Sequence, residues 1–189
     1  MIKQFLPLEN HDIFINLEKE IFKGNILDVG LDNYGIIYSI VKSYNDNINV
    51  DYINGHHDKN RIEENYYDSC ILFFTINKIV SNINKKHFIN DIAKYLTNNG
   101  KIYIWDINKS FGKLFKGNLK IAMPKGEIKK FKLNNYNFLS NNSYKNVMIL
   151  LKNNFNIIDS QSSNDIYYIK AEKITKGKEE SNESTINSH

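Results

Sequence analysis

Short, continuous apolar runs alternate along the chain with stretches whose apolar positions recur at helical spacing. The apolar runs, which predict strands, occupy residues 26–29, 48–53, 68–74 and 101–106. Helical spacing is found at residues 12–22, 36–43, 88–96 and 144–151. Near-continuous apolar runs are typical of strands buried on both faces of a parallel sheet. Because strands alternate with helices, the pattern predicts an α/β fold with ligands beyond the carboxyl ends of its strands.

The ends of the chain add elements to this prediction. Residues 12–22 carry Ile13, Phe14, Leu17 and Ile21 at helical spacing, which predicts a helix that covers the sheet before the first strand. Residues 155–159 and 165–172 are two strand-like runs joined by a polar turn, and they predict an antiparallel pair at a sheet edge.

A second hairpin is expected in the middle of the chain. Residues 119–123 and 127–133 flank a Pro-Lys-Gly turn at 124–126. Ser143 is a suitable N-cap for the helix that follows. The segment 98–100, Asn-Asn-Gly, is a suitable stop for the helix at 88–96.

The stretch 25–35, Asn-Ile-Leu-Asp-Val-Gly-Leu-Asp-Asn-Tyr-Gly, is the best candidate for a binding site. Its apolar run stops at Gly30, and Gly35 opens the next amphipathic stretch, which predicts a strand, a tight turn and a helix. Such a turn brings backbone N–H groups at a helix N-terminus toward an anionic or polar ligand. An ordinary turn of a parallel sheet, without a ligand, explains the same residues.

Composition bounds the class of protein. A chain of 189 residues with 41% hydrophobic and 13% aromatic residues has enough apolar material for one globular domain. Apolar runs long enough for a membrane span and the apolar core of a signal peptide are both missing, so a cytoplasmic location is expected. The single cysteine, Cys70, excludes an internal disulfide and a multi-cysteine metal site, and its apolar neighbours predict a buried core residue. No metal site is expected at residues 56–58, His-His-Asp, which lack a third ligand.

The positive charge is carried almost entirely by lysine. The formal net charge is +4, and Arg61 is the single arginine among 25 basic residues. Because arginine is preferred for bidentate contacts to guanine and phosphate, sequence-specific nucleic-acid binding is disfavoured. Between residues 109 and 132 many lysines are balanced by Glu127 alone. This segment suits an anionic acceptor, or it is a solvated lysine-rich hairpin.

Four segments resemble the class I S-adenosylmethionine-dependent methyltransferases, which have a Rossmann-like fold. They are residues 26–30, Ile-Leu-Asp-Val-Gly, together with 67–72, 96–106 and 150–173. The resemblance covers about residues 12 to 173 and implies a mostly parallel sheet with an antiparallel C-terminal edge hairpin. We accordingly expect one methyltransferase-like domain at 1–175, with a lysine-rich hairpin insertion at 109–135 and a disordered tail at 176–189.

The interval between Asp28 and Asp68 is shorter than in that family. It holds one helix and one strand where the family usually has two of each, so one strand–helix unit is missing. The strand at 48–53 matches either the second or the third strand of the family. We favour the second position, because a short right-handed crossover places it beside the first strand and only an edge strand is then lost.

The resemblance implies S-adenosylmethionine as the cofactor and assigns roles to residues of this chain. Asp28 would orient the turn or hold the methionine ammonium group, and Gly30 would let the backbone approach the cofactor. Asp32 would meet the methionine carboxylate unfavourably but could accept from the ammonium group, and Asp51 would accept hydrogen bonds from the ribose. The remaining candidates are Tyr52, Gly55 and His56 on the adenine side and Phe74 and Thr75 on the methyl-donor side. Asp106 and Asn108 are acceptor contacts or a base, or else surface caps. No catalytic residue is assigned, because methyl transfer is an in-line displacement that needs no protein nucleophile.

Three functions remain open on the sequence. The first is a methyltransferase with a small-molecule acceptor. The second is a non-catalytic binding or assembly module of the same fold that has lost the cofactor, since Asp32 and Tyr34 occupy positions where the family has glycine. The third, a nicotinamide-dependent enzyme, is disfavoured by the glycine spacing.

Overall fold

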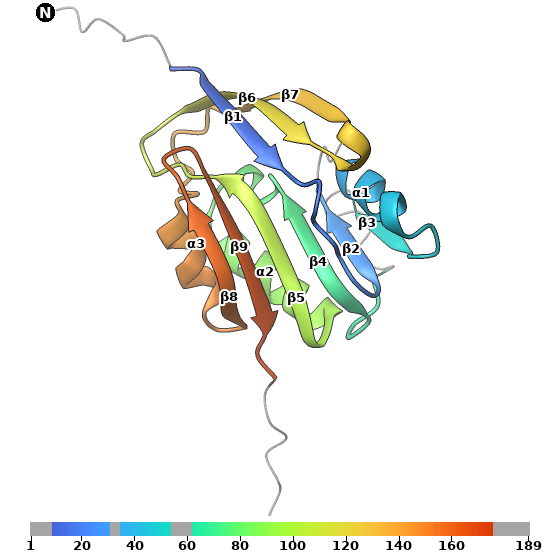
Figure 1. Ribbon diagram of the computed structural model, residues 1–189. Coiled ribbons are helices and arrows are strands. Elements are labelled where there is room, and N and C mark those ends of the chain that lie inside the picture. The colour runs from blue at the N-terminus through green and yellow to red at the C-terminus, as the bar shows by residue number, and fades with distance from the viewer. Residues whose placement is uncertain (1–8, 31–34, 54–61, 176–189) are drawn as a thin grey trace, which may run out of the picture.

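The computed structural model of the protein describes residues 9–30, 35–53 and 62–175 (Figure 1). Within these residues the larger sheet has six strands in the order β3-β2-β4-β5-β9-β8. They are β2 (Ile26–Val29), β3 (Val50–Ile53), β4 (Tyr67–Phe73), β5 (Leu96–Ile107), β8 (Phe155–Ser162) and β9 (Ile166–Lys173). Strands β3, β2, β4 and β5 are parallel, and β9 is antiparallel to both β5 and β8. The predicted mostly parallel sheet with an antiparallel edge hairpin is confirmed.

Helices cover the two faces of this sheet. Helix α1 (Ile36–Tyr44) packs on one face, while α2 (Asn82–Tyr95) and α3 (Tyr144–Leu151) pack on the other. Every residue of β2 is buried, which explains its continuous apolar run. Ser143 caps α3 as predicted, because its side chain accepts a hydrogen bond from the Asn146 N–H. None of the helices in the described residues is long and apolar enough to cross a membrane.

Strand β3 lies beside β2 at the edge of the sheet, which agrees with the predicted second position. Its residues pair in register with those of β2, from Ile26 with Val50 to Val29 with Ile53. No further strand occurs between β3 and β4 among the described residues, although residues 54–61 lie outside them.

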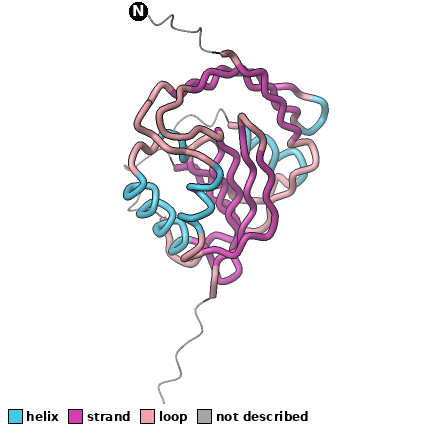
Figure 2. Tube along the Cα trace, turned by 90° about the vertical axis from the view of Figure 1, so that its left-hand side faces the viewer, coloured by secondary structure: helices cyan, strands magenta, loops and turns pink. Residues whose placement is uncertain are grey.

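A second, smaller sheet lies across the end of the large sheet toward which β2, β4 and β5 point (Figures 1 and 2). In the described residues it consists of β1 (His11–Asn16), β6 (Phe115–Ala122) and β7 (Ile128–Asn135), in that order. Strand β1 is parallel to β6, and β6 and β7 form the predicted antiparallel hairpin. We call β1, β6 and β7 the cap sheet. Its inner face shares one hydrophobic core with α1 and with one face of the large sheet.

The predicted helix at residues 12–22 is wrong, because this segment begins with strand β1. Ile13 and Ile15 are buried, whereas Phe14 is 63% exposed and Ile21 is 58% exposed. The buried apolar residues therefore alternate with a period of two, as in a strand. Strand β1 forms its backbone hydrogen bonds with β6. The stop at 98–100 is also misplaced, because α2 ends at Tyr95 and these residues belong to β5.

Candidate cofactor site

The carboxyl ends of β2, β3 and β4 bring several predicted site residues to one edge of the sheet. Asp28 is level with Tyr52 on β3 and with Ile71 on β4. Because the three strands are parallel and neighbouring, the segments that follow them begin at the same edge. Gly30, Phe74 and Thr75 all lie in these following segments.

Asp28 is a buried acid inside a buried strand. Its exposed fraction is 1%, although carboxylates are almost never fully buried without polar or charged neighbours. Its charge contributes, after burial itself, to raising the pKa of the neighbouring Cys70 thiol well above its usual value. Cys70 is fully buried, as predicted, and its raised pKa keeps it a thiol.

The turn after β2 is fixed at both of its described ends. The Gly30 N–H donates to the Ile53 carbonyl oxygen at 3.2 Å, which extends the pairing of β2 with β3 past the last strand residue. Gly35 caps α1 in the left-handed conformation with φ at 64°, a backbone conformation that favours glycine. Among the described residues no side chain caps this end of α1, and its first turn holds no acidic residue. Asp32 lies outside the described residues.

Tyr52 and Asp51 point to opposite faces of the sheet, as neighbouring strand residues do. The Tyr52 hydroxyl donates to the Gly30 carbonyl oxygen at 2.9 Å, so its half-exposed side chain reaches the turn after β2. Asp51 instead accepts a hydrogen bond from the Tyr67 hydroxyl at 2.8 Å. Burial, together with this bond and the Asp51 charge, raises the pKa of Tyr67. The structure therefore places Tyr52 with Asp28 and separates Asp51 from both. Gly55 and His56 lie outside the described residues.

Thr75 and Phe74 form the start of the loop after β4. The buried Thr75 hydroxyl donates to the Val29 carbonyl oxygen at 2.6 Å, which ties this loop to the end of β2. Phe74 has a φ of 54°, an unusual backbone conformation for an aromatic residue that costs of order 1–3 kcal/mol. Its backbone N–H donates to the Trp105 carbonyl oxygen at 2.8 Å. The loop is thus held against both of its neighbouring strands.

Asp106, at the end of β5, belongs to a buried network and is not a surface cap. Its exposed fraction is 0%, and it accepts hydrogen bonds from the Asn77 backbone at 3.0 Å, the Asn77 side chain at 2.8 Å and the Ile107 backbone at 2.7 Å. Burial raises the pKa of Asp106 to about 6, an effect that these bonds and Lys85 partly oppose. Asn135 of the cap sheet donates to the Asn77 carbonyl oxygen at 2.8 Å. This network joins β5, the loop after β4 and the cap sheet.

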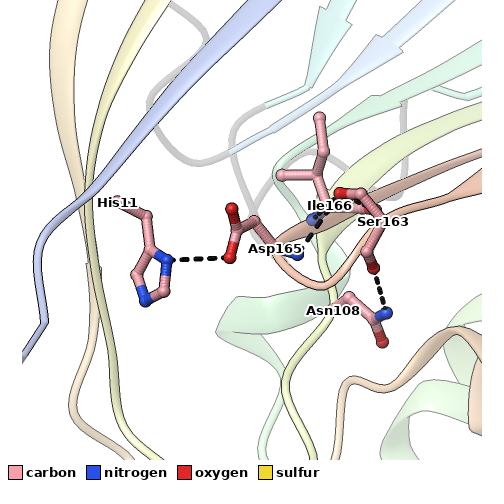
Figure 3. Close-up of polar contacts among 5 residues, drawn as sticks. All are labelled: His11, Asn108, Ser163, Asp165 and Ile166. Atoms are coloured by element: carbon pink, nitrogen blue, oxygen red, sulfur yellow. Dashed lines mark hydrogen bonds and ion pairs between the residues drawn. The ribbon is translucent and has the colours of Figure 1, made fainter.

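A second contact joins the cap sheet to the turn between β8 and β9. Figure 3 shows His11 of β1 facing Asp165 in the turn between β8 and β9, and their Nδ1 and Oδ1 atoms are 2.8 Å apart. Asn108 holds that turn, because its side chain donates to the Ser163 carbonyl oxygen at 2.6 Å. Asn108 therefore serves the turn between β8 and β9. The sequence offered no signal for the His11 contact, because the two residues are far apart in the chain.

Asp106 predicts a pH dependence of stability. In the folded protein its pKa is about 6, against 3.8 for an ordinary aspartate, so between these values the folded state binds a proton that the unfolded chain does not. This contribution is fully present below the lower pKa and is lost as pH rises through about 6. The shift corresponds to about 3 kcal/mol. Urea unfolding between about pH 4 and pH 7.5 should show the wild type gaining stability relative to Asp106→Asn as pH falls. A difference between the two proteins that stays constant over this range would contradict the assignment.

Comparisons with known proteins concern the fold. No protein-family model matches the sequence, and no curated protein matches it. Solved structures do match. A SAM-dependent methyltransferase from Methanosarcina mazei has a TM-score of 0.51 at 12% identity, over 80% of this chain and 93% of that chain. One from Mesorhizobium loti has a TM-score of 0.51 at 9% identity, over 79% and 90%.

A third structure contains a bound product of the cofactor. It is the 1,6-didemethyltoxoflavin-N1-methyltransferase of Burkholderia thailandensis, with 1,6-didemethyltoxoflavin and S-adenosylhomocysteine bound. Its TM-score is 0.52 at 11% identity, over 79% of this chain and 71% of that chain. The chain has the class I methyltransferase fold. At these identities the likeness concerns the fold, and within the described residues no cluster of side chains suitable for a metal ion accompanies it.

Proposed function

We propose that the protein is an S-adenosylmethionine-dependent methyltransferase with a small-molecule acceptor. The observation that carries this proposal is the position of Asp28, a buried acid one residue before the end of β2 in a sheet of the class I methyltransferase order. A carboxylate is a suitable acceptor for an ammonium group, and a buried one interacts more strongly than one in water.

The other residues at this edge have complementary roles in the proposal. The cofactor supplies an activated methyl group, so the protein has to position two reactants and exclude water. Asp28 accepts from the methionine ammonium group, and Gly35 begins helix α1 at the same edge, where backbone N–H groups of a helix N-terminus suit a polar or anionic group. The Tyr52 ring provides an apolar surface on the adenine side. Thr75 fixes the loop after β4, which lies on the methyl-donor side.

Asp51 is less suitable for a ribose contact than the sequence suggests. Its carboxylate already accepts from the Tyr67 hydroxyl, and it is level with Leu27, two positions before the last residue of β2. This observation favours the second candidate function, a binding or assembly module of the methyltransferase fold without the cofactor.

Calorimetric titration distinguishes the two functions. We expect S-adenosylhomocysteine and S-adenosylmethionine to bind the wild type and NAD not to bind. Asp28→Asn should weaken binding of both by about 5- to 15-fold, because it replaces a charge-assisted hydrogen bond worth about 1.5–3 kcal/mol with a neutral one worth about 0.5–1.5 kcal/mol.

A matched control is Asp159→Asn, which changes an exposed acid on β8 and should leave affinity unchanged. Thermal unfolding of each variant establishes that it is folded. Wild-type protein that binds neither compound would support the non-catalytic module, and NAD binding alone would contradict both functions.

A further inference from the structure

The outer face of the cap sheet is basic. The strands alternate, so Leu119 and Leu133 point into the core while the residues between them point outward. Four lysines are exposed on this outer face, two on each of the neighbouring strands β6 and β7: Lys116, Lys120, Lys130 and Lys132. Phe14 of β1 lies on the same face and is 63% exposed. We call these five residues the lysine face.

The register places like charges opposite each other. Lys120 pairs directly with Lys130, and Phe14 pairs with Lys120, so these three residues form one row across the three strands. In the described part of the chain, no carboxylate lies within ion-pair distance of the four ammonium groups. Asp12, the acid on this face, accepts a hydrogen bond from the Asn118 side chain at 2.9 Å. Like charges directly opposite on a ladder are destabilising, and a bound anion would relieve this repulsion.

We propose that the lysine face binds single-stranded nucleic acid without sequence preference. Lysines contact phosphate groups as point charges, and an exposed ring beside them is a platform on which a base can stack. Lys116 and Lys120 are four residues apart on one strand, which corresponds to roughly 13–14 Å, enough to follow several phosphate groups of an extended strand. The absence of arginine from this face fits binding that does not read the base sequence.

The shape of the face favours a strand of nucleic acid over a membrane surface. A peripheral membrane site usually buries several apolar side chains beside its basic residues. Phe14 is at one end of the row, on β1, and the other exposed apolar residue of these strands, Ile128, is the first residue of β7, so the two lie on opposite edge strands of the cap sheet. The outer face also points away from the candidate cofactor site, as the arch of the cap sheet over the large sheet shows (Figure 2). The inference therefore stands independently of the proposed enzymatic function.

Fluorescence anisotropy with a labelled oligothymidylate and a labelled oligouridylate of about twelve nucleotides tests the proposal. Four phosphate contacts predict that the logarithm of the association constant falls with the logarithm of salt concentration with a slope of about −2.8. The double variant Lys120→Ala/Lys130→Ala should bind at least tenfold more weakly at low salt, and its slope should be shallower by about 1.4. Phe14→Ala should weaken binding about 5- to 100-fold with an unchanged slope, because stacking does not release counterions.

The matched control is Lys86→Ala/Lys152→Ala, which removes two exposed lysines that are not on the cap sheet. Thermal unfolding establishes that all variants are folded. Wild-type protein that does not bind either oligonucleotide overturns the proposal, and so does an equal loss of affinity in the control variant. Binding to vesicles of phosphatidylserine and phosphatidylcholine without binding to oligonucleotides would also overturn it, in favour of an anionic membrane surface.

Discussion

Replacing Lys109 with methionine is expected to lower the free energy of unfolding by about 2–4 kcal/mol. Lys109 is 2% exposed, and its ammonium group donates to three backbone carbonyl oxygens: those of Lys113 at 3.0 Å, Asn137 at 2.8 Å and Ser140 at 2.8 Å. Hydrogen bonds to a charged group contribute about 1.5–3 kcal/mol each. Methionine fills similar space but leaves all three acceptors without this donor, while the recovered desolvation of the ammonium group offsets part of the loss.

Lys109→Met should also have a local effect on the two segments that Lys109 holds together. Lys109 joins the segment after β5 to the segment between β7 and α3, so its loss should raise amide hydrogen exchange in residues 109–114 and 136–142 before the rest of the protein. Lys113→Met is the control. The exposed Lys113 side chain makes none of these hydrogen bonds, because Lys113 contributes only its backbone carbonyl oxygen as an acceptor. Equal exchange in wild type and Lys109→Met would show that the lysine does not hold these segments together.

The burial of Lys109 is also a feature that could not be predicted from the sequence. It belongs to a run of lysines that differ little in local sequence, yet Lys109 is buried while Lys130 and Lys132 are exposed. A buried ammonium group requires acceptors from distant segments, and these acceptors are backbone carbonyls, which every residue has. No pattern of residue types could therefore have separated Lys109 from its neighbours.

The large sheet was predictable because its signals are local. Each apolar run needs only its own residues to predict a buried strand, and the end of β2 before Gly30 and the start of α1 after Gly35 follow from the same local pattern. Strand β1 was not predictable in this way. Apolar residues at 13, 14, 15, 17 and 21 satisfy both the helical and the strand period in part, and the partner that decides between them, β6, is about a hundred residues away. The same long separation hides the cap sheet as a unit.

The residues of the candidate site also differ in how far their positions could be predicted from the sequence. Asp28 and Thr75 follow from their positions near strand ends, which order and spacing reveal. The role of Asp51 does not, because it depends on which face of β3 the side chain takes and on the reach of Tyr67 from the start of β4. Register decides such contacts, and a change of one residue moves a side chain to the other face of the sheet.

Asp106→Ala should destabilise the protein by about 2–4 kcal/mol at neutral pH, and Asp106→Asn by less. Alanine leaves three buried N–H donors, two from Asn77 and one from Ile107, without an acceptor, at about 1–3 kcal/mol each. Removal of the buried charge offsets part of this cost, because the raised pKa reflects a net preference of about 3 kcal/mol for the neutral form even with these hydrogen bonds in place. Asparagine keeps one side-chain oxygen, which still accepts from the Asn77 side chain and the Ile107 N–H. Its own amide group then faces the third donor, the Asn77 backbone N–H.

Urea unfolding at neutral pH provides the measurement, and Asp159→Ala on the exposed side of β8 provides the control, with an expected change below about 0.5 kcal/mol. Because Asn77 links Asp106 to Asn135, the alanine variant should also loosen the cap sheet, seen as faster amide exchange in β7 than in β2. If Asp106→Ala were as stable as the wild type, the network would contribute no net stability, since burying the charge would cost as much as its hydrogen bonds gain. Faster exchange confined to β2 would instead place the link between the two sheets elsewhere.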